Sequence, residues 1–171
     1  TSTLLSLRDR WLAAWPRAIA CWSRHTRLRE PLLCLEEKAA VAEGLQGSFA
    51  MIRLRDQAIV VNLAEVAVRN LGDYAVEVLA HEIGHHVLAP ATLTDHLRML
   101  ARMQRALPTL EAHAPMLANL YTDLLINDRL QRFAAAYRQA AERLRARADV
   151  IDLRYPNGFA MRVARAGEGR K

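Results

Sequence analysis

The stretch that decides the fold is residues 73–90, DYAVEVLAHEIGHHVLAP. Its apolar residues recur at helical spacing, which predicts a helix that packs one face against a core. Asp73 stands where an N-cap residue is preferred, and Pro90 cannot continue a helix. We therefore predict a helix over residues 73–89.

This predicted helix carries an HExxH motif. His81 and His85 lie four residues apart on one helical face, so both imidazole rings can reach one metal ion. Glu82 lies where its carboxylate can take a proton from a water molecule on that metal as the water attacks a carbonyl. Gly84 leaves room for close packing on the opposite side. His86 points about 100° away from His85 and is expected to take no part.

Two histidines need a third protein ligand to make a catalytic zinc site. The extended motif HExxHxxGxxH would require glycine at position 88 and histidine at position 91. The chain has Leu88 and Ala91 there, which excludes that arrangement. A carboxylate on a later helix is the other common source.

The segment 118–130 supplies the best such carboxylate. Asn119, Asp123 and Asn127 are spaced by four between apolar residues, which predicts a polar stripe on an otherwise apolar helix. Burying an unpaired carboxylate costs several kcal/mol, and a metal ion or a hydrogen-bonded partner offsets that cost. We therefore predict Asp123 as the third ligand, with Asn119 and Asn127 orienting it or the histidine rings.

Alternatives to this ligand set stay open. Asp123 could instead face solvent or cap a neighbouring helix. Asp128 is the rival ligand, and it lies about 140° round the helix from Asp123, so both cannot readily serve one ion. His25 is expected to be an exposed surface residue. Three weaker competitors lie on or near predicted loops: Glu111, His113 and His96.

The rest of the chain predicts a predominantly helical α+β fold with a small sheet packed on the HExxH helix. Two β-rich runs, Ser48–Leu54 and Ala58–Leu63, predict strands near 48–55 and 58–63. Further helices are expected over 3–24 (bent or restarted at Pro16), 33–44, about 94–107, 116–133 and 134–148, and a turn at 156–158. We predict one domain over 1–171, with N-terminal helices in 3–44, a catalytic core at about 45–133, and a basic C-terminal helix and tail over 134–171.

The composition and the distribution of charge exclude some classes of protein. With 52% hydrophobic and 25% charged residues, the chain is typical of a globular protein and not of a disordered one. The net charge of +6 is divided unevenly, because residues 1–29 carry six arginines and one acid, and residues 129–171 carry eleven basic and four acidic residues. The middle, 30–128, has seven basic and thirteen acidic residues, which suits a divalent cation. We therefore do not expect nucleic-acid binding.

The hydropathy pattern and the two cysteines indicate the cellular compartment. No run approaches the length of a membrane span, and Arg8 and Asp9 interrupt the first apolar stretch, which a secretory signal would not have. Cys21 and Cys34 lack CxxC spacing and are expected to be free thiols. We expect a cytoplasmic protein with no membrane partner.

These motifs resemble the zincin metallopeptidases, within them the gluzincin-like group with an acidic third ligand on a downstream helix. The second motif is similar to that of bacterial metallopeptidase-like domains found alongside von Willebrand A-type proteins and MoxR-type ATPases. The resemblance covers roughly residues 45–133. Where typical gluzincins have an ExxxD pattern, this chain has Asn119 in the glutamate position. The match is carried by His81, Glu82 and His85 and by the Asn119-x-x-x-Asp123-x-x-x-Asn127 pattern.

The resemblance implies a zinc-dependent endopeptidase that acts on protein or peptide substrates. One Zn²⁺ per chain would be held by His81, His85 and Asp123, with Glu82 as the general base. It also implies that an edge strand, Ala58–Leu63 or Ser48–Leu54, lines the cleft and pairs with an extended substrate. Four residues are candidate donors to the oxyanion of the transition state: Tyr121, Tyr155, His113 and Arg129.

A second hypothesis is a catalytically silent zincin-like module that docks a protein partner through its basic helical ends. Absence of metal after purification with added zinc would favour it. The need for a regulatory protein partner stays open under both hypotheses.

Overall fold

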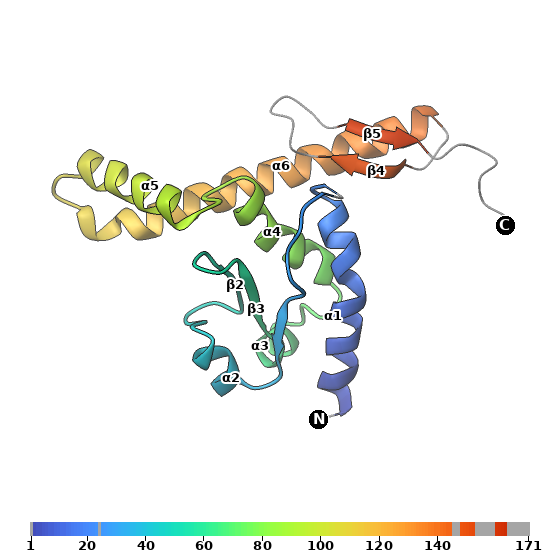
Figure 1. The fold of residues 1–171 in the computed structure, drawn as a ribbon, viewed down its shortest axis with the longest axis horizontal. Helices are drawn as coiled ribbons and strands as arrows, with labels where there is room; N and C mark the ends of the chain where they lie inside the picture. Colours follow the sequence, from blue (N-terminus) through green and yellow to red (C-terminus); the bar gives the residue numbers. More distant parts are fainter. Residues whose placement is uncertain (1, 24, 145–147, 153–159, 164–171) are drawn as a thin grey trace.

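The computed structural model describes residues 2–23, 25–144, 148–152 and 160–163. The described chain is mostly helical, with one small mixed sheet and a separate strand pair (Figure 1). The elements run in the order α1 (Ser2–Ala20), β1 (Leu32–Cys34), α2 (Glu37–Ala42), β2 (Ala50–Arg53), β3 (Ala58–Asn62), α3 (Leu63–Val68), α4 (Ala75–Val87), α5 (Leu93–Ala106), the 3₁₀ turn η1 (Glu111–His113), α6 (Ala114–Leu144), β4 (Ala148–Asp152) and β5 (Ala160–Val163).

The three-stranded sheet has the order β1-β3-β2. β3 is central and buried along its whole length, and it pairs parallel with β1 and antiparallel with β2. β2 is therefore an edge strand, which settles one of the open alternatives. Ala58–Leu63 lies at the centre of the sheet, and the predicted edge strand falls in Ser48–Leu54.

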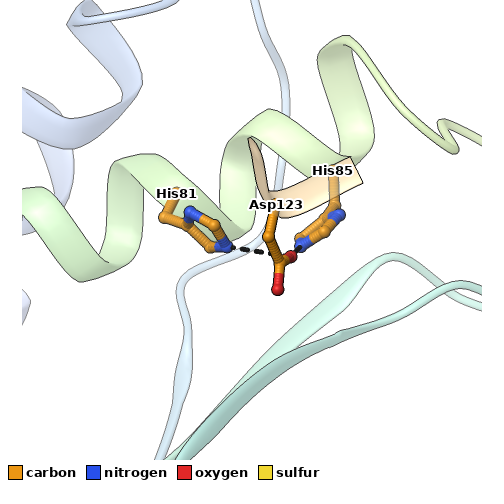
Figure 2. A group of neighbouring side chains, drawn as sticks. All are labelled: His81, His85 and Asp123. Atoms are coloured by element: carbon orange, nitrogen blue, oxygen red, sulfur yellow. Dashed lines mark ion pairs between the residues drawn. The ribbon is translucent and has the colours of Figure 1, made fainter. Parts of the chain in front are cut away.

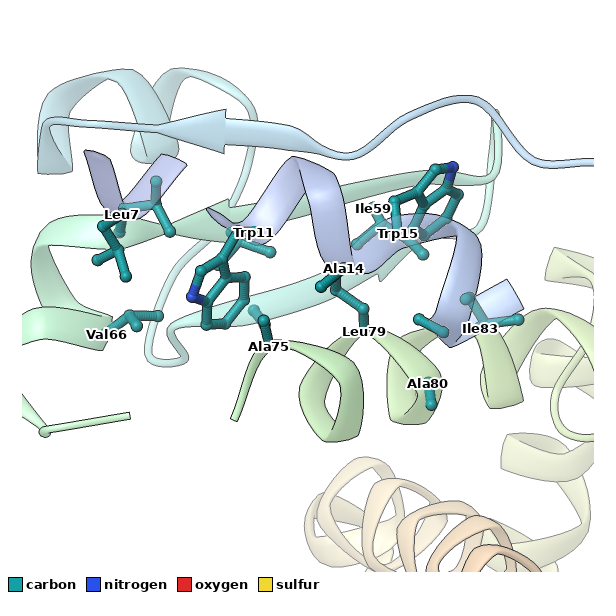
Figure 3. Close-up of a cluster of buried hydrophobic side chains, with 14 of the residues drawn as sticks. Leu7, Trp11, Ala14, Trp15, Ile59, Val66, Ala75, Leu79, Ala80 and Ile83 are labelled. Carbon is teal, nitrogen blue, oxygen red and sulfur yellow. The ribbon is translucent and has the colours of Figure 1, made fainter. Parts of the chain in front are cut away.

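The core lies between α1, α4 and the sheet, and tryptophans of α1 fill much of it (Figure 3). Trp11 and Trp15 are buried, and so is Trp22, which follows the helix. The indole nitrogen of Trp11 donates to the carbonyl of Gly72 at 3.1 Å, and that of Trp22 donates to Ala80 at 2.6 Å. These two hydrogen bonds satisfy the indole N–H groups of Trp11 and Trp22 and tie the N-terminal segment to α4 and the residue Gly72 before it.

Helices α4 and α6 approach closely at Gly84. A Cβ atom at this position would lie 2.6 Å from Cγ2 of Ile126 and 2.7 Å from Cζ2 of Trp22. No side chain larger than hydrogen fits without movement, as the sequence predicted for this side of the helix. The glycine thereby lets α6 lie directly on α4.

Several predicted boundaries are wrong in detail. The predicted helix over 33–44 is a strand, β1, followed by the short helix α2, because the register of Leu32–Cys34 against β3 gives its backbone partners that a local pattern does not reveal. Asp73 does not cap α4, whose N-cap residue is Tyr74. The Asp73 carboxylate instead accepts a hydrogen bond from Arg10 at 3.0 Å.

The C-terminal part also differs from the prediction. The two helices expected over 116–133 and 134–148 are one helix, α6, since neither glycine nor proline interrupts the chain there. The expected tail contains the antiparallel pair β4 and β5. The turn predicted at 156–158 lies outside the described residues.

The two cysteines, Cys21 and Cys34, are free thiols, and burial raises the pKa of both. Across the described residues, no helix combines the length and apolar character that crossing a membrane requires.

The contact at Gly84 yields a stability prediction. We expect Gly84→Ala to lower the free energy of unfolding by about 1–3 kcal/mol, because overpacking of the α4–α6 contact outweighs the better helix propensity of alanine. Urea denaturation measures the change. The double variant Gly84→Ala/Ile126→Ala removes one of the two clashing side chains. Unchanged stability of the single variant would show that the two helices do not depend on this contact.

Candidate metal centre

Three predicted ligand residues come together between α4 and α6 (Figure 2). Nε2 of His81 lies 3.4 Å from Oδ1 of Asp123, and Nε2 of His85 lies 3.3 Å from the same oxygen. One ligand atom from each residue lies within 4.8 Å of the other two. The group could therefore hold one metal ion.

Hydrogen bonds fix how each histidine ring is turned. Nδ1 of His85 lies 3.0 Å from the carbonyl oxygen of Ala89, which can only accept, so Nδ1 carries the proton. Nδ1 of His81 lies 2.9 Å from Oδ1 of Asn127 and donates to it in the same way. In the neutral rings, both Nε2 atoms are then unprotonated, and their lone pairs face Asp123.

With both rings neutral, this arrangement brings three acceptor atoms together without a proton between them. Burial and the neighbouring His81 lower the pKa of His85, which disfavours the imidazolium form that would otherwise supply a proton. A bound cation would offset this repulsion. For metal–ligand bonds of about 2.0–2.2 Å, two ligand atoms of a tetrahedral site lie roughly 3.3–3.6 Å apart. The two measured N···O distances, 3.4 and 3.3 Å, fall in that range.

The carboxylate of Asp123 is itself held in place. Nδ2 of Asn119 donates to its Oδ2 at 3.1 Å, which leaves Oδ1 to face the histidines. Asn119, Asp123 and Asn127 thus form the polar stripe that the spacing predicted, and the two asparagines contact the groups they were expected to orient. The ligand role of Asp123 stays a prediction.

Glu82 lies beside this group and is buried, with 7% of its surface exposed. Burial raises its pKa to about 8, the charge of Asp123 adds to the rise, and a hydrogen bond from the backbone of Ile52 opposes it. A carboxyl group with a pKa near neutrality can take up and release a proton at physiological pH.

An open cleft of about 710 Å³ lies over the group and reaches it from solvent. Strand β2 and the residues just before it form one wall, α4 forms another, and α6 contributes Asn119, Thr122 and Asp123. His81, Glu82 and His85 all line this space. A molecule in the cleft would therefore contact the histidines, the buried glutamate and the edge strand together.

The structure separates the rival residues from the cluster. Asp128 is exposed and accepts a hydrogen bond from Arg132 at 2.8 Å, so it belongs to the outer face of α6. Glu111 and His113 are exposed in the η1 turn, and His25 is exposed as expected. His86 bonds Oε1 of Gln57 at 2.6 Å and does not join the cluster.

The residues considered as oxyanion donors do not line the described cleft. Tyr121, His113 and Arg129 are absent from its walls, and Tyr155 lies outside the described residues. His96, one of the weaker competitors for the ligand role, lines the cleft from α5 but does not belong to the group of three ligand residues. Sequence reasoning missed two cleft residues, Tyr74 and Glu77, which reach it from the start of α4. Spacing alone could have found Glu77, which precedes His81 by one helical turn.

Comparisons of the chain with protein-family models, curated proteins and solved structures found no match.

The raised pKa of Glu82 predicts how stability depends on pH in chelator. Between its ordinary value of 4.5 and the folded value of about 8, the folded chain holds a proton that the unfolded chain has lost. The resulting stabilisation is complete below the lower value and is lost as pH rises through the upper one, at up to about 1.4 kcal/mol per pH unit.

Urea denaturation of wild type and Glu82→Gln at several pH values between 5 and 8 measures this effect. We expect the wild type to lose stability relative to the variant as pH rises, because glutamine cannot ionise. Parallel profiles for the two proteins would contradict the assignment.

The contact between Asn127 and His81 predicts an effect on metal affinity. Asn127→Leu removes the acceptor that fixes the ring, so we expect zinc affinity to fall about 10- to 100-fold. Asn127→Asp keeps an acceptor oxygen and serves as the matched control, with affinity near that of the wild type. Competition with a chromophoric chelator measures both. Equal affinity of the leucine variant and the wild type would exclude the positioning role.

Proposed function

We propose that the protein is a zinc-dependent metalloendopeptidase that hydrolyses peptide bonds of protein substrates. The observation that carries the proposal is the convergence of two imidazole nitrogens and one carboxylate oxygen beside a buried glutamate, at the floor of an open cleft. One Zn²⁺ per chain would be held by His81, His85 and Asp123.

The donor set supports zinc in a catalytic role. Imidazole nitrogens suit zinc, and two of them with one carboxylate are a common catalytic set. Structural zinc sites are closed by four protein ligands, whereas catalytic sites keep one position for water or substrate. Among the described residues, the cluster consists of three ligands and faces the cleft.

In hydrolysis, the metal ligands and Glu82 would have different roles. When bound, a zinc ion acts as a Lewis acid that polarises the peptide carbonyl and lowers the pKa of water. Glu82 accepts a proton from the water whose oxygen bonds to the carbonyl carbon. It donates this proton to the peptide nitrogen as the carbon–nitrogen bond breaks, and a carboxylic acid and an amine leave.

Strand β2 offers a place for the substrate backbone. The N–H of Asn62 donates to the carbonyl of Phe49 at 2.8 Å, so Phe49 faces β3, and the alternate residues Ala50 and Ile52 turn their backbone groups to the other side. There the hydroxyl of Ser48 donates to the carbonyl of Ala50 at 2.9 Å, and the backbone of Ile52 bonds Glu82. A substrate strand would replace the contact with Ser48 and bond the carbonyl of Ile52. An extended peptide can add to such an edge through main-chain hydrogen bonds. This supports a peptide substrate. The free thiols support action in the cytoplasm.

Two variants test the mechanism. We expect the purified wild type to bind one zinc per chain and to cleave unfolded casein, and Glu82→Gln to keep the zinc but lose cleavage by at least about a hundredfold, since the proton acceptor is gone. Mass spectrometry of the products and metal analysis measure both. Cleavage by Glu82→Gln at the wild-type rate would overturn the mechanism.

The third ligand is tested by a matched pair on α6. Asp123→Ala should lose zinc, whereas Asp128→Ala, which removes an exposed carboxylate five residues further along, should keep it. The reverse result would move the ligand role to Asp128. Failure of the wild type to bind added zinc would instead favour a catalytically silent binding module.

A further inference from the structure

We propose that the end of the cleft formed by Tyr74 and Glu77 binds a cationic group of the substrate, either a lysine or arginine side chain or a free amino terminus. This inference rests on the proposed function, because it concerns the substrate of the same cleft. It makes Glu77 a specificity-determining residue.

Glu77 lies on α4 at a distance from the metal centre that a substrate side chain can reach. Glu77, His81 and His85 are spaced by four on α4, and all three line the cleft. With a rise of about 1.5 Å per residue, Glu77 lies one turn, or about 6 Å along the helix, from His81. An extended peptide advances about 3.3 Å per residue, so Glu77 is within reach of a side chain one or two residues from the reacting bond.

The charged side chains that line the cleft are all acidic, apart from its histidines. The cleft walls contain three carboxylates, Glu77, Glu82 and Asp123, and none of the described lysines and arginines lines it. Two of these carboxylates have roles at the metal centre. Glu77 has no ion-pair partner in the described part of the chain, so its charge is available to a ligand.

Arg69 lies next to this end of the cleft, but its charge is already paired. The guanidinium of Arg69 lies over the ring of Phe49, 5.4 Å from its centroid, and Arg69 pairs with Glu65 at 2.8 Å. Phe49 belongs to the cleft wall, whereas Arg69 does not. The carboxylate of Glu77 therefore keeps its attraction for a substrate cation.

Aromatic and apolar side chains near Glu77 can contact the cationic group and the aliphatic stem of a lysine or arginine. Tyr74 lies three residues before Glu77 on the same side of the helix start, and 54% of its surface is exposed. An exposed aromatic ring next to a carboxylate can receive a cation on its face. Leu71 and Val78 also line the cleft and can pack against the aliphatic stem of lysine or arginine.

The direction of β2 places Phe49 at the same end. The turn after β2 contacts the far end of α4, since Gln57 bonds His86 at 2.6 Å and the carbonyl of Ala91 at 3.3 Å. The beginning of β2 therefore lies toward the start of α4. One end of the cleft thus combines a carboxylate with aromatic and apolar walls.

Two measurements test the proposal. In the first, wild type, Glu77→Gln, Glu77→Lys and the control Glu37→Gln digest a mixture of peptides, and mass spectrometry records the residues near each cut. In the second, the zinc-loaded Glu82→Gln protein, with and without each change, binds fluorescein-labelled peptides that differ only in lysine or methionine at one position. Glu37 is an exposed carboxylate of α2 that does not line the cleft.

We expect basic residues, or free amino termini, to be preferred about two- to fivefold, as for an exposed ion pair. Glu77→Gln should remove the preference, Glu77→Lys should invert it toward acidic peptides, and Glu37→Gln should leave it unchanged. Acetylating the amino termini of the peptides separates the two sources of the cation. A preference that persists in Glu77→Gln, or the absence of any preference, overturns the inference.

The two proposals fail in distinguishable ways. Cleavage without a preference that depends on Glu77 leaves the metalloendopeptidase in place and removes the subsite. Binding of lysine peptides that depends on Glu77, without any cleavage, keeps the subsite and removes the peptidase. The absence of both cleavage and binding overturns both.

Discussion

The close approach of α4 and α6 at Gly84 is the constraint on which the candidate site depends. His81 and His85 come from one helix and Asp123 from the other, so the three can meet only if the two helices touch. Gly84 and Ile126 make this contact on the side of α4 that faces the core, against Trp22. Trp22, which bonds the carbonyl of Ala80 on α4, thereby also supports the position of the carboxylate. In this fold, core packing and site geometry share the same residues.

The charges around His81, His85 and Asp123 depend on how these side chains are held. The partners of both Nδ1 atoms fix the tautomers, so the two Nε2 lone pairs face a carboxylate that Asn119 holds from behind. Such a group is unfavourable without a proton or a cation among its members. The same charges that favour a cation there help to raise the pKa of Glu82. The three candidate ligands and the neighbouring Glu82 therefore influence one another electrostatically.

The sequence was sufficient for the parts that depend on local spacing and insufficient for those that depend on distant pairing. The HExxH helix and the stripe from Asn119 to Asn127 follow from a period of four, and the structure brings them together. Strand β1 was missed because only its pairing with β3, far along the chain, makes it a strand. Tyr74 was missed as a cleft residue because several elements together define a cleft, whereas the spacing of Glu77 from His81 could have indicated that residue. Choosing between Asp123 and Asp128 likewise required the contact with α4.

The central claim is that His81, His85 and Asp123 bind one zinc ion, and anomalous diffraction at the zinc absorption edge tests it most directly. Crystals grown with equimolar zinc should show one anomalous peak per chain, bonded at about 2.0–2.2 Å to Nε2 of both histidines and to Oδ1 of Asp123. A peak bonded to other residues, such as Asp128, would contradict the account. So would crystals of a zinc-saturated solution with no peak between α4 and α6.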